Sequence, residues 1–440
     1  MVRSGSCDSP MKPFLIPMLC VACTPSKSTD TASPHPAEER SFYLVSETST
    51  GKMLVASNEH GRVEGELCLS DIFPEQCGAG TSELARPCLM FGVSHQRSDD
   101  DDRFLITATL RDPDRPFAPG IVSLVRPSDP PEALWSIRNL TIPRELQSGF
   151  DCEVDGEAPQ CHLYGAHTTI SLDDGTLIVS DTSNSRVVWI ETPDLGAETG
   201  NVVAILSSQH PQWGDERYPN LVQPLTIDER DHLLITFKGG VDHSSSPTNE
   251  GRIALWDVSD RSLPERVWVF PEVGHLSAVH SGRFVETPAG DMLIYAHSLG
   301  ASEGGTEHRE GTIGFAQFNG LEPPKYLADG TLPDPGFGFT REVEWNGDIQ
   351  RLIVTDSGCE NAQDSCGRSG RVIALSLPEL NQSDRGGSAQ PDLSDQDFIE
   401  LDWKRTVIDQ ALELPFDTNR IPFSEAGAQL REGLGPCHSP

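Results

Sequence analysis

Three histidines in this 440-residue chain stand at similar distances from a recurring apolar strand pattern. His95 and His167 each precede the aligned leucine of the pattern by 10 residues, and His280 precedes it by 13. A neutral imidazole can act as a nucleophile or proton carrier, and three imidazoles could bind a metal. Arg341 stands near the same place in a later copy, and arginine beside histidine can bind an oxyanion such as sulfate or phosphate. Ordinary histidines, hydrogen-bonded at strand starts, are the alternative.

The pattern itself is an apolar strand that follows a tight turn and ends in small or polar residues, such as TLIVSD at 176–181. Its copies align on six leucines, with spacings of 51, 72, 57, 59 and 59 residues: Leu54, Leu105, Leu177, Leu234, Leu293 and Leu352. A second strand follows most copies, a third often carries an aromatic residue, and another strand precedes most copies. The sequence therefore predicts about four strands in each of six units.

A single four-stranded sheet cannot bury both of its faces, but radial packing lets each sheet cover its neighbour. We therefore predict an all-β fold, a six-bladed β-propeller of four-stranded antiparallel blades. Helical patterns do not alternate with the strands, which argues against a parallel α/β fold. A two-domain β-sandwich is the alternative, and the nearly constant spacing disfavours it. The segment KRTVIDQALE at 404–413 fits one short helix near the end.

Equivalent positions in different blades converge around the axis of a propeller. His95, His167, His280 and Arg341 are therefore predicted to surround the mouth of the central channel, and the fourth unit places Pro224 there. The predicted loops between second and third strands are long and lie on the same face: 237–251, 296–311 and 356–370. Long loops on one face of a rigid scaffold are a common location for function.

The chain carries 33 basic and 67 acidic residues, which gives a net charge of −34. A surface this negative repels nucleic acid and anionic lipid, so we expect no nucleic-acid partner. We expect a monomer whose partner is a small molecule, a protein or a glycan. The sequence lacks a phosphate-binding Gly-Lys loop, a dinucleotide fingerprint and a His-Glu-x-x-His motif, so we predict no cofactor and no metal.

The N-terminus has the pattern of a targeting segment. Lys12 precedes a short apolar run at 14–19, and Ala22 precedes Cys23 as in a bacterial lipobox. We predict a signal peptide over 1–23 with lipidation at Cys23, then a flexible polar tether over 24–40. Simple secretion and a cytosolic protein are the alternatives. The protein is expected to be exported, periplasmic or on the cell surface, and held at the membrane only by the lipid.

The propeller is predicted to occupy 41–440, with 404–440 as a closing segment. Eight of the 11 cysteines lie within it, an even number that agrees with an oxidising compartment. Two pairs are close enough in sequence to be local disulfides: Cys152 with Cys161, and Cys359 with Cys366. Cys68, Cys77, Cys88 and Cys437 allow three connectivities, some of which join the two ends of the chain.

The segment GAHTTISLDDGTLIVSDTSNSRVVWIE at 165–191, echoed by VHSGRFVETPAGDMLIYAH at 279–297, resembles bacterial arylsulfate sulfotransferases. The resemblance implies a six-bladed propeller with an axial histidine that carries the sulfuryl group covalently. It also implies that nearby His, Asn and Arg side chains hold the sulfate. The stretch DTSNSRV at 181–187 is similar to the NHL-type propeller repeat, in which Asp and Arg brace the blade, so Asp181 and Arg186 are predicted to be structural.

Applied to this chain, the resemblance implies His167 or His280 as the catalytic nucleophile and Arg341 as a residue that binds the anion. We predict His95 and His297 as further ligand-binding residues. The leading prediction is an exported propeller lipoprotein that binds a small anionic or aromatic ligand at the central channel. Arylsulfotransferase-like sulfuryl transfer through an axial histidine would be its chemistry. The alternative is a non-catalytic propeller scaffold that binds a protein or glycan through its long loops.

Overall fold

The computed structural model divides the chain into two units, Met1–Glu39 and Arg40–Pro440, and every residue that it describes lies in the second. The described residues are 42–47, 51–57, 63–78, 88–98, 101–110, 120–128, 130–143, 146, 161–239, 241–242, 246–247, 251–272, 276, 279–287, 290–299, 310–330, 340–346, 351–356, 371–376 and 408–414. The predicted signal peptide, Cys23 and the tether therefore lie outside the described residues.

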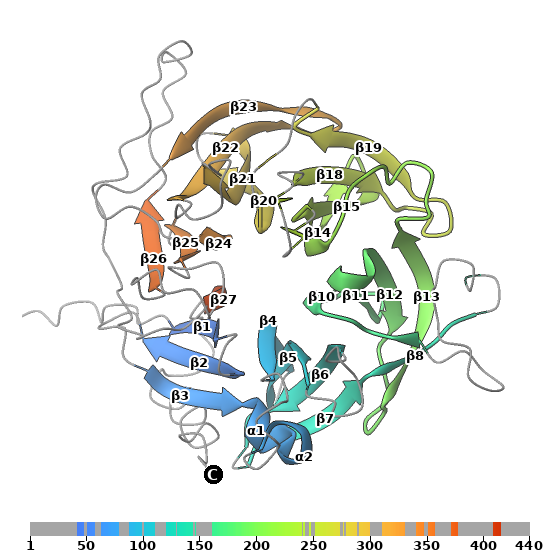
Figure 1. The fold of residues 1–440 in the computed structure, drawn as a ribbon, viewed down its shortest axis with the longest axis vertical. Coiled ribbons are helices and arrows are strands. Elements are labelled where there is room, and N and C mark those ends of the chain that lie inside the picture. Colours follow the sequence, from blue (N-terminus) through green and yellow to red (C-terminus); the bar gives the residue numbers. More distant parts are fainter. Residues whose placement is uncertain are drawn as a thin grey trace, which may run out of the picture. The chain divides into compact units, whose positions relative to one another are not determined.

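Within the second unit, mostly antiparallel sheets are arranged radially around an axis (Figure 1). Sheet 1 contains β27 (Ile408–Leu414), β1 (Phe42–Glu47), β2 (Lys52–Ser57) and β3 (Val63–Cys68). Sheet 2 contains β4 (Leu89–Ser98), β5 (Asp101–Thr109), β6 (Gly120–Arg126) and β7 (Glu132–Ile137). Sheet 3 contains β10 (Ala166–Ser171), β11 (Thr176–Asp181), β12 (Arg186–Glu191), β13 (Thr199–Ser207), β8 (Asn139–Thr141) and β9 (Cys161–His162).

The second half of the ring repeats this plan. Sheet 4 contains β14 (Pro219–Ile227), β15 (Arg230–Phe237), β18 (Arg252–Asp257) and β19 (Glu265–Phe270). Sheet 5 contains β20 (Ser281–Thr287), β21 (Gly290–Leu299), β22 (Glu310–Asn319) and β23 (Glu322–Gly330). Sheet 6 has three described strands, β24 (Thr340–Asn346), β25 (Arg351–Asp356) and β26 (Arg371–Ser376).

Short elements complete the described part of the unit. They are the helices α1 (Leu69–Ile72) and α2 (Pro74–Cys77), the 3-10 turn Thr182–Asn184 and a small hairpin of β16 (Val241–Asp242) and β17 (Ser246–Pro247). Among the helices of the described residues, none is long and apolar enough to span a membrane.

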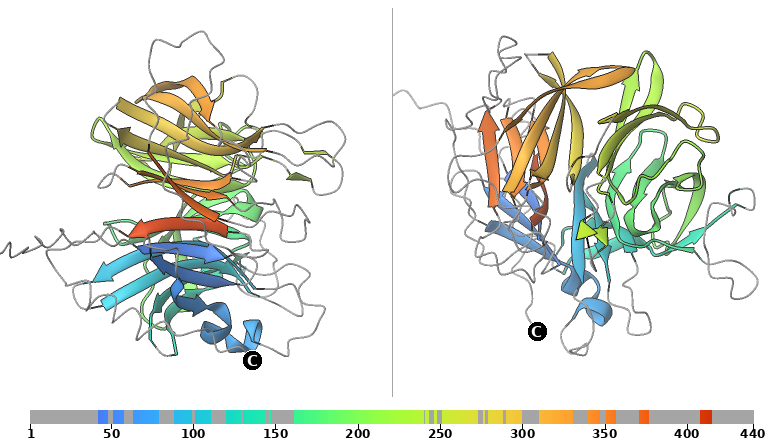
Figure 2. Two further views of the ribbon diagram at one scale, coloured as in Figure 1. Left: turned by 90° about the vertical axis from the view of Figure 1, so that its left-hand side faces the viewer. Right: turned by 45° about the horizontal axis from the view of Figure 1, so that its top comes forward.

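The inner strands form a closed series of neighbours. Each contacts the inner strand of the next sheet, from β4 through β10, β14, β20 and β24 to β27, which contacts β4 again. The tilted view shows the sheets packed face to face around this ring (Figure 2). The predicted all-β propeller is therefore confirmed, and the two-domain sandwich is wrong.

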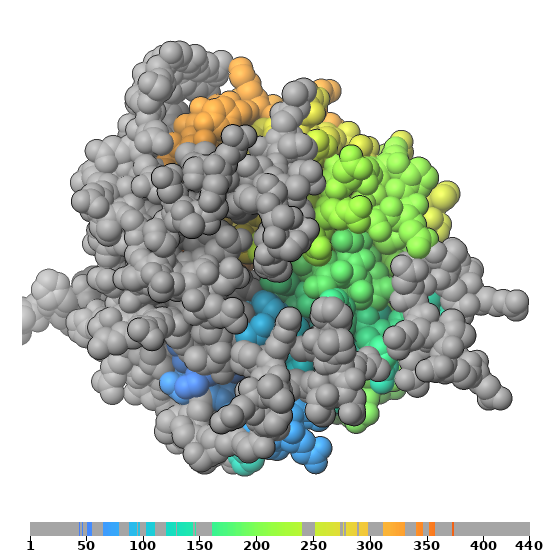
Figure 3. Space-filling model, viewed as in Figure 1, coloured from blue at the N-terminus to red at the C-terminus, as the bar shows by residue number. Residues whose placement is uncertain are grey.

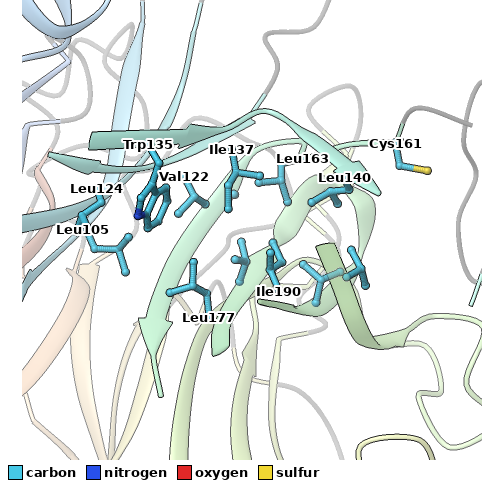
Figure 4. Close-up of a cluster of buried hydrophobic side chains, with 14 of the residues drawn as sticks. Leu105, Val122, Leu124, Trp135, Ile137, Leu140, Cys161, Leu163, Leu177 and Ile190 are labelled. Atoms are coloured by element: carbon cyan, nitrogen blue, oxygen red, sulfur yellow. The ribbon is translucent and has the colours of Figure 1, made fainter. Parts of the chain in front are cut away.

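The hydrophobic core lies between neighbouring sheets. Strand β11 has all six residues buried, because both of its faces pack against other sheets, whereas the outer strand β13 alternates between exposed and buried residues. Figure 4 shows one such layer, where Trp135 and Ile137 of sheet 2 face Leu177 and Ile190 of sheet 3. The continuous apolar runs of the sequence pattern thus reflect burial on two faces.

Closure of the ring corrects two predictions about the ends of the chain. Part of the predicted helix at 404–413 is instead strand β27, which pairs antiparallel with β1 over Phe42–Leu414 to Glu47–Ile408. The need of β1 for an inner partner outweighs the local helix preference of this segment. Because β27 supplies the first strand of sheet 1, KMLVAS at 52–57 is the third strand of its sheet, whereas the other copies of the pattern are second strands.

The described cysteines take part in disulfides. Cys77 at the end of α2 is bonded to Cys88 just before β4, which selects one of the predicted connectivities. Cys68 and Cys161 are also disulfide-bonded. Their partners, and the predicted pair of Cys359 and Cys366, lie outside the described residues.

Candidate functional site

A small cavity lies where the first halves of five inner strands meet at the axis. Its lining comes from β4, β10, β14, β20 with the residue before it, and β24, and includes Phe91, His167, Asn220, His280, Arg341 and Glu342. The cavity volume is about 20 Å³, which is enough for a compact occupant such as a water molecule or a small ion. The residues therefore converge from five sheets although they are up to 251 positions apart in sequence.

Bulges in the inner strands bring these side chains to the cavity. The pairing between first and second strands shifts register at one equivalent place in four sheets, at Phe91, at His167 and Thr168, at Asn220 and at Arg341. A bulge inserts an extra residue and redirects its side chain, and bulges are enriched next to functional sites. The repeated bulge is thus the backbone feature that defines the site.

Buried hydroxyl groups on the second strands hold the bulges in place. Ser46 Oγ donates to the carbonyl oxygen of Phe91 (2.9 Å), and Ser180 Oγ donates to that of Asn220 (3.0 Å). Thr107 Oγ1 donates to Thr169 Oγ1 across the same kind of boundary (3.1 Å). Each bond runs from one sheet to the inner strand of the next, which explains why the apolar strands of the sequence pattern end in small polar residues.

The aromatic side of the cavity is also tightly fitted. The rings of Phe91 and His167 stack with centroids 4.3 Å apart and planes inclined by 28°. A side chain at Gly92 would overlap the carbonyl oxygen of His167, so only glycine permits this approach of β4 to β10. The stacking fixes the His167 ring at the edge of the cavity.

His280 is almost fully buried in the site, and its surroundings favour the uncharged imidazole. Its side chain is buried, and burial lowers the pKa of His280 well below its ordinary value. The positive charges of Lys238 and Arg341 and the neighbouring His167 lower this pKa further. A neutral imidazole keeps a lone pair, so His280 is suited to nucleophilic or hydrogen-bonding roles.

Carboxylates near the cavity have a cation of their own. Arg283 Nη2 of β20 donates to Glu342 Oε1 of β24 (2.6 Å), and Arg283 Nε lies 2.7 Å from Glu344 Oε2. Burial raises the pKa of Glu344, and Arg283 opposes that shift. Glu342 is thus engaged by a guanidinium from the neighbouring sheet, while Lys238 and Arg341 act on His280.

The structure brings together three of the predicted residues, His167, His280 and Arg341, in one cavity. His95 does not share their register, since it pairs with Phe104 four residues beyond Phe91 on β4. Equal spacing to the leucine did not give equal register, because β4 and β5 form a longer hairpin than β10 and β11 do. Phe91 takes the place that we predicted for His95.

His297 lies away from the cavity. It is in β21, with its Nε2 3.0 Å from Asp329 Oδ1 of the outer strand β23, and Tyr326 donates its hydroxyl to Asp329 Oδ2 (3.0 Å). Its position on the second strand directs the ring toward the outside of sheet 5. His297 is therefore not among the residues that line the axial cavity, and its ligand-binding role stays a prediction.

Sequence reasoning missed Phe91, Asn220 and Lys238. The predicted residue of the fourth unit, Pro224, pairs with Leu233 in the middle of β14, four residues beyond the bulge at Asn220. Aligning the sheets on the small polar residues of the second strands would have found Phe91 and Asn220. Lys238 follows β15 directly and had no such signal.

Asp181 and Arg186 form the bracing ion pair that the sequence predicted. Arg186 Nε donates to Asp181 Oδ2 (2.6 Å), and both side chains are buried. Asn184 Nδ2 donates to the same oxygen (2.8 Å), and the backbone N–H of Tyr164 donates to Oδ1 (2.6 Å). The pair ties the end of β11 to the loop before β10 and so supports the strand that carries His167.

The described residues contain no group of three or more His, Cys, Asp or Glu side chains placed to hold a metal ion. The space-filling view from the axial side shows sheets 3, 4 and 5 at the surface of the described part (Figure 3).

No known protein family matches the sequence, and no curated protein is similar to it in sequence. Similar solved structures include the periplasmic gluconolactonase of Pseudomonas aeruginosa, with 10% identity, a TM-score of 0.43 and coverage of 86% of this chain and 99% of that chain. A protein of unknown function from Bacteroides caccae has 11% identity, a TM-score of 0.43 and coverage of 85% and 98%. Levansucrase from Bacillus subtilis has 9% identity, a TM-score of 0.39 and coverage of 71% and 88%.

Proposed function

We propose that this propeller binds a small anion in the axial cavity. The observation that carries the proposal is the convergence of His167, His280 and Arg341 on one cavity, with the positive charge of Lys238 also acting on His280. Arginine and neutral histidine both donate hydrogen bonds to oxyanions. The chain has a net charge of −34, so basic side chains near the axis contrast with the acidic composition of the rest of the chain. This contrast favours an anionic ligand at the axis.

The test is a calorimetric titration of the folded protein with inorganic phosphate and with sulfate. Wild-type protein should bind at least one of them, and Arg341→Met should weaken that binding by about tenfold or more because a charge-assisted hydrogen bond is lost. Arg341→Lys, which keeps the charge, should retain part of the affinity. The matched control is Arg261→Met, since Arg261 is a partly exposed arginine between β18 and β19 that pairs with Asp174 and does not line the cavity. Absence of binding by wild-type protein, or equal binding by Arg341→Met, would contradict the proposal.

Sulfuryl transfer is the second candidate function, and the neutral, buried state of His280 favours it. In that reaction an imidazole nitrogen of His280 or His167 would form a bond to sulfur while the sulfur–oxygen bond to the phenolic leaving group breaks. Attack by the oxygen of a second phenol would release the sulfuryl group and restore the imidazole. Incubation with a chromogenic aryl sulfate and a phenol acceptor tests this, alongside His280→Ala and His167→Ala. Turnover that neither change affects, or no turnover at all, would exclude the axial-histidine mechanism.

We also propose that sheet 6 is the sixth blade. The closed series of inner strands supports this count.

Export and lipid attachment at Cys23 remain our proposals. They are supported by the lipobox-like sequence and by the disulfide-bonded state of Cys68, Cys77, Cys88 and Cys161. If no small anion binds, the alternative function is that of a non-catalytic scaffold that binds a protein or glycan.

A further inference from the structure

Asn220 is held in the axial cavity by contacts on both its side chain and its backbone. It is the bulge residue of β14, and its exposed fraction is only 8%. Its side-chain Nδ2 donates to the carbonyl oxygen of His280 (2.8 Å). Its own carbonyl oxygen accepts hydrogen bonds from Thr168 Oγ1 (2.7 Å) and Ser180 Oγ (3.0 Å). The residue therefore has a fixed position between sheets 3 and 5.

The bond to His280 also settles which way the amide points. A carbonyl oxygen is only an acceptor, so the amide nitrogen must face it and Oδ1 must face elsewhere. Oδ1 is buried and has no hydrogen-bond partner among the described residues. An unpaired buried acceptor is costly, and native structures retain one mainly where a ligand or water completes the bond. Asn220 thus offers the occupant of the cavity an unpaired acceptor oxygen, while one N–H of its amide is already engaged by the carbonyl oxygen of His280.

The basic side chains at the cavity, in contrast, require a hydrogen-bond acceptor. Arg341 lines the cavity, and the positive charge of Lys238 acts on His280. Glu342 also lines the cavity, but Arg283 pairs with it, so an anion is the complementary occupant. An ion that accepts at most of its oxygens and donates from one would satisfy both Arg341 and the unpaired Oδ1 of Asn220. Sulfate has no proton to donate near neutral pH, so its oxygen would meet Oδ1 lone pair to lone pair.

We propose that Asn220 makes the axial cavity selective for oxyanions that carry their own O–H donor, such as hydrogenphosphate, over oxyanions that have none, such as sulfate. This inference rests on the proposed anion-binding function. It assigns Asn220 as a specificity-determining residue, whose acceptor oxygen forms a hydrogen bond only with a ligand that carries a proton.

The experiment compares three ions by calorimetric titration of the wild-type protein in a slightly alkaline buffer. Monofluorophosphate is the key probe, because its dianion has nearly the shape and charge of hydrogenphosphate but carries fluorine where hydrogenphosphate carries O–H. We expect phosphate to bind about tenfold or more tightly than monofluorophosphate or sulfate. Only hydrogenphosphate forms a hydrogen bond to the buried acceptor, which otherwise stays unpaired. Equal affinities would overturn the inference while leaving anion binding intact. Absence of binding by all three would instead overturn the proposed function.

A pair of variants supplies the protein-side test. Asn220→Ala removes the acceptor, so the preference for phosphate over monofluorophosphate should fall to near one. The matched control is Gln223→Ala. Gln223 lies on the same strand and forms two hydrogen bonds to the backbone of β20. Its Nε2 donates to the carbonyl oxygen of Phe284, and its Oε1 accepts from the backbone N–H of Phe284. It should keep the preference, and loss of preference in the control but not in Asn220→Ala would refute the assignment. The ligand series on wild-type protein decides the question if Asn220→Ala does not fold.

Discussion

Replacing Asp181 by asparagine should destabilise the fold far more than the same change at an exposed ion pair. The Asp181 side chain is 0% exposed, and that of its partner Arg186 is 5% exposed. Burial raises the pKa of the Asp181 carboxyl, and the charge of Arg186 with the donors Asn184 and Tyr164 opposes this shift. The carboxylate therefore depends on three donors that an amide cannot all satisfy.

The magnitude follows from that geometry. Arg186 Nε and Asn184 Nδ2 both donate to Oδ2, while the Tyr164 N–H donates to Oδ1. An asparagine must direct its NH2 group at one of these positions, which sets donor against donor and leaves the Arg186 guanidinium without a counter-charge. Breaking a buried ion pair in this way costs about 3–5 kcal/mol.

The matched control is Asp174→Asn in the same sheet. Asp174 pairs with Arg261, but its side chain is 47% exposed, and exposed pairs contribute about 0–1 kcal/mol. Urea unfolding followed by tryptophan fluorescence measures both losses, with the slope of the transition checked to be unchanged. The double variant Asp181→Leu with Arg186→Met should recover part of the loss, since it removes both charges. A cost for Asp181→Asn that does not exceed that of Asp174→Asn would refute the bracing role.

Two further predictions concern protonation and covalent closure. Because burial holds the pKa of His280 well below its ordinary value, the unfolded chain takes up a proton that the folded chain excludes, and the free energy of unfolding should fall as the pH drops below about 6.5. His280→Gln should remove this component, so its stability difference from wild type should change by up to about 1.4 kcal/mol per pH unit there, and a difference independent of pH would contradict the prediction. Since Cys77 and Cys88 pair with each other, we predict that the partner of Cys68 is Cys437. Mass spectrometry of a non-reduced digest should find that linked peptide, and Cys68 joined to any other cysteine would show the prediction to be wrong.

The site was partly predictable, and the misses share one cause. His167, His280 and Arg341 were found because each stands just before or at the start of an inner strand, and such starts converge in a propeller. Counting from the leucines failed for His95 because the count runs around a hairpin, and hairpins of different length bring different residues opposite each other. Register is set by pairing across strands, which spacing along the chain does not report.

The C-terminal segment shows how ring closure overrides local preference. KRTVIDQALE contains good helix formers, yet its residues from Ile408 onward form β27, because β1 at the start of the propeller needs an inner partner. Because β27 pairs with β1 as the first strand of sheet 1, KMLVAS is the third strand of its sheet and not the second. A pattern of repeats predicts that a ring forms but gives no information on where the ring is closed.

The sequence by itself determined the all-β repeat, the propeller, the bracing pair of Asp181 with Arg186 and the concentration of histidines at the axis. These features follow from local patterns that recur with each unit. Tertiary structure decided which side chains share the cavity, since four bulges and the buried hydroxyls of neighbouring sheets select Phe91 over His95 and Asn220 over Pro224. It also decided the charge state of His280, because desolvation and the approach of Lys238 and Arg341 exist only once the sheets have packed.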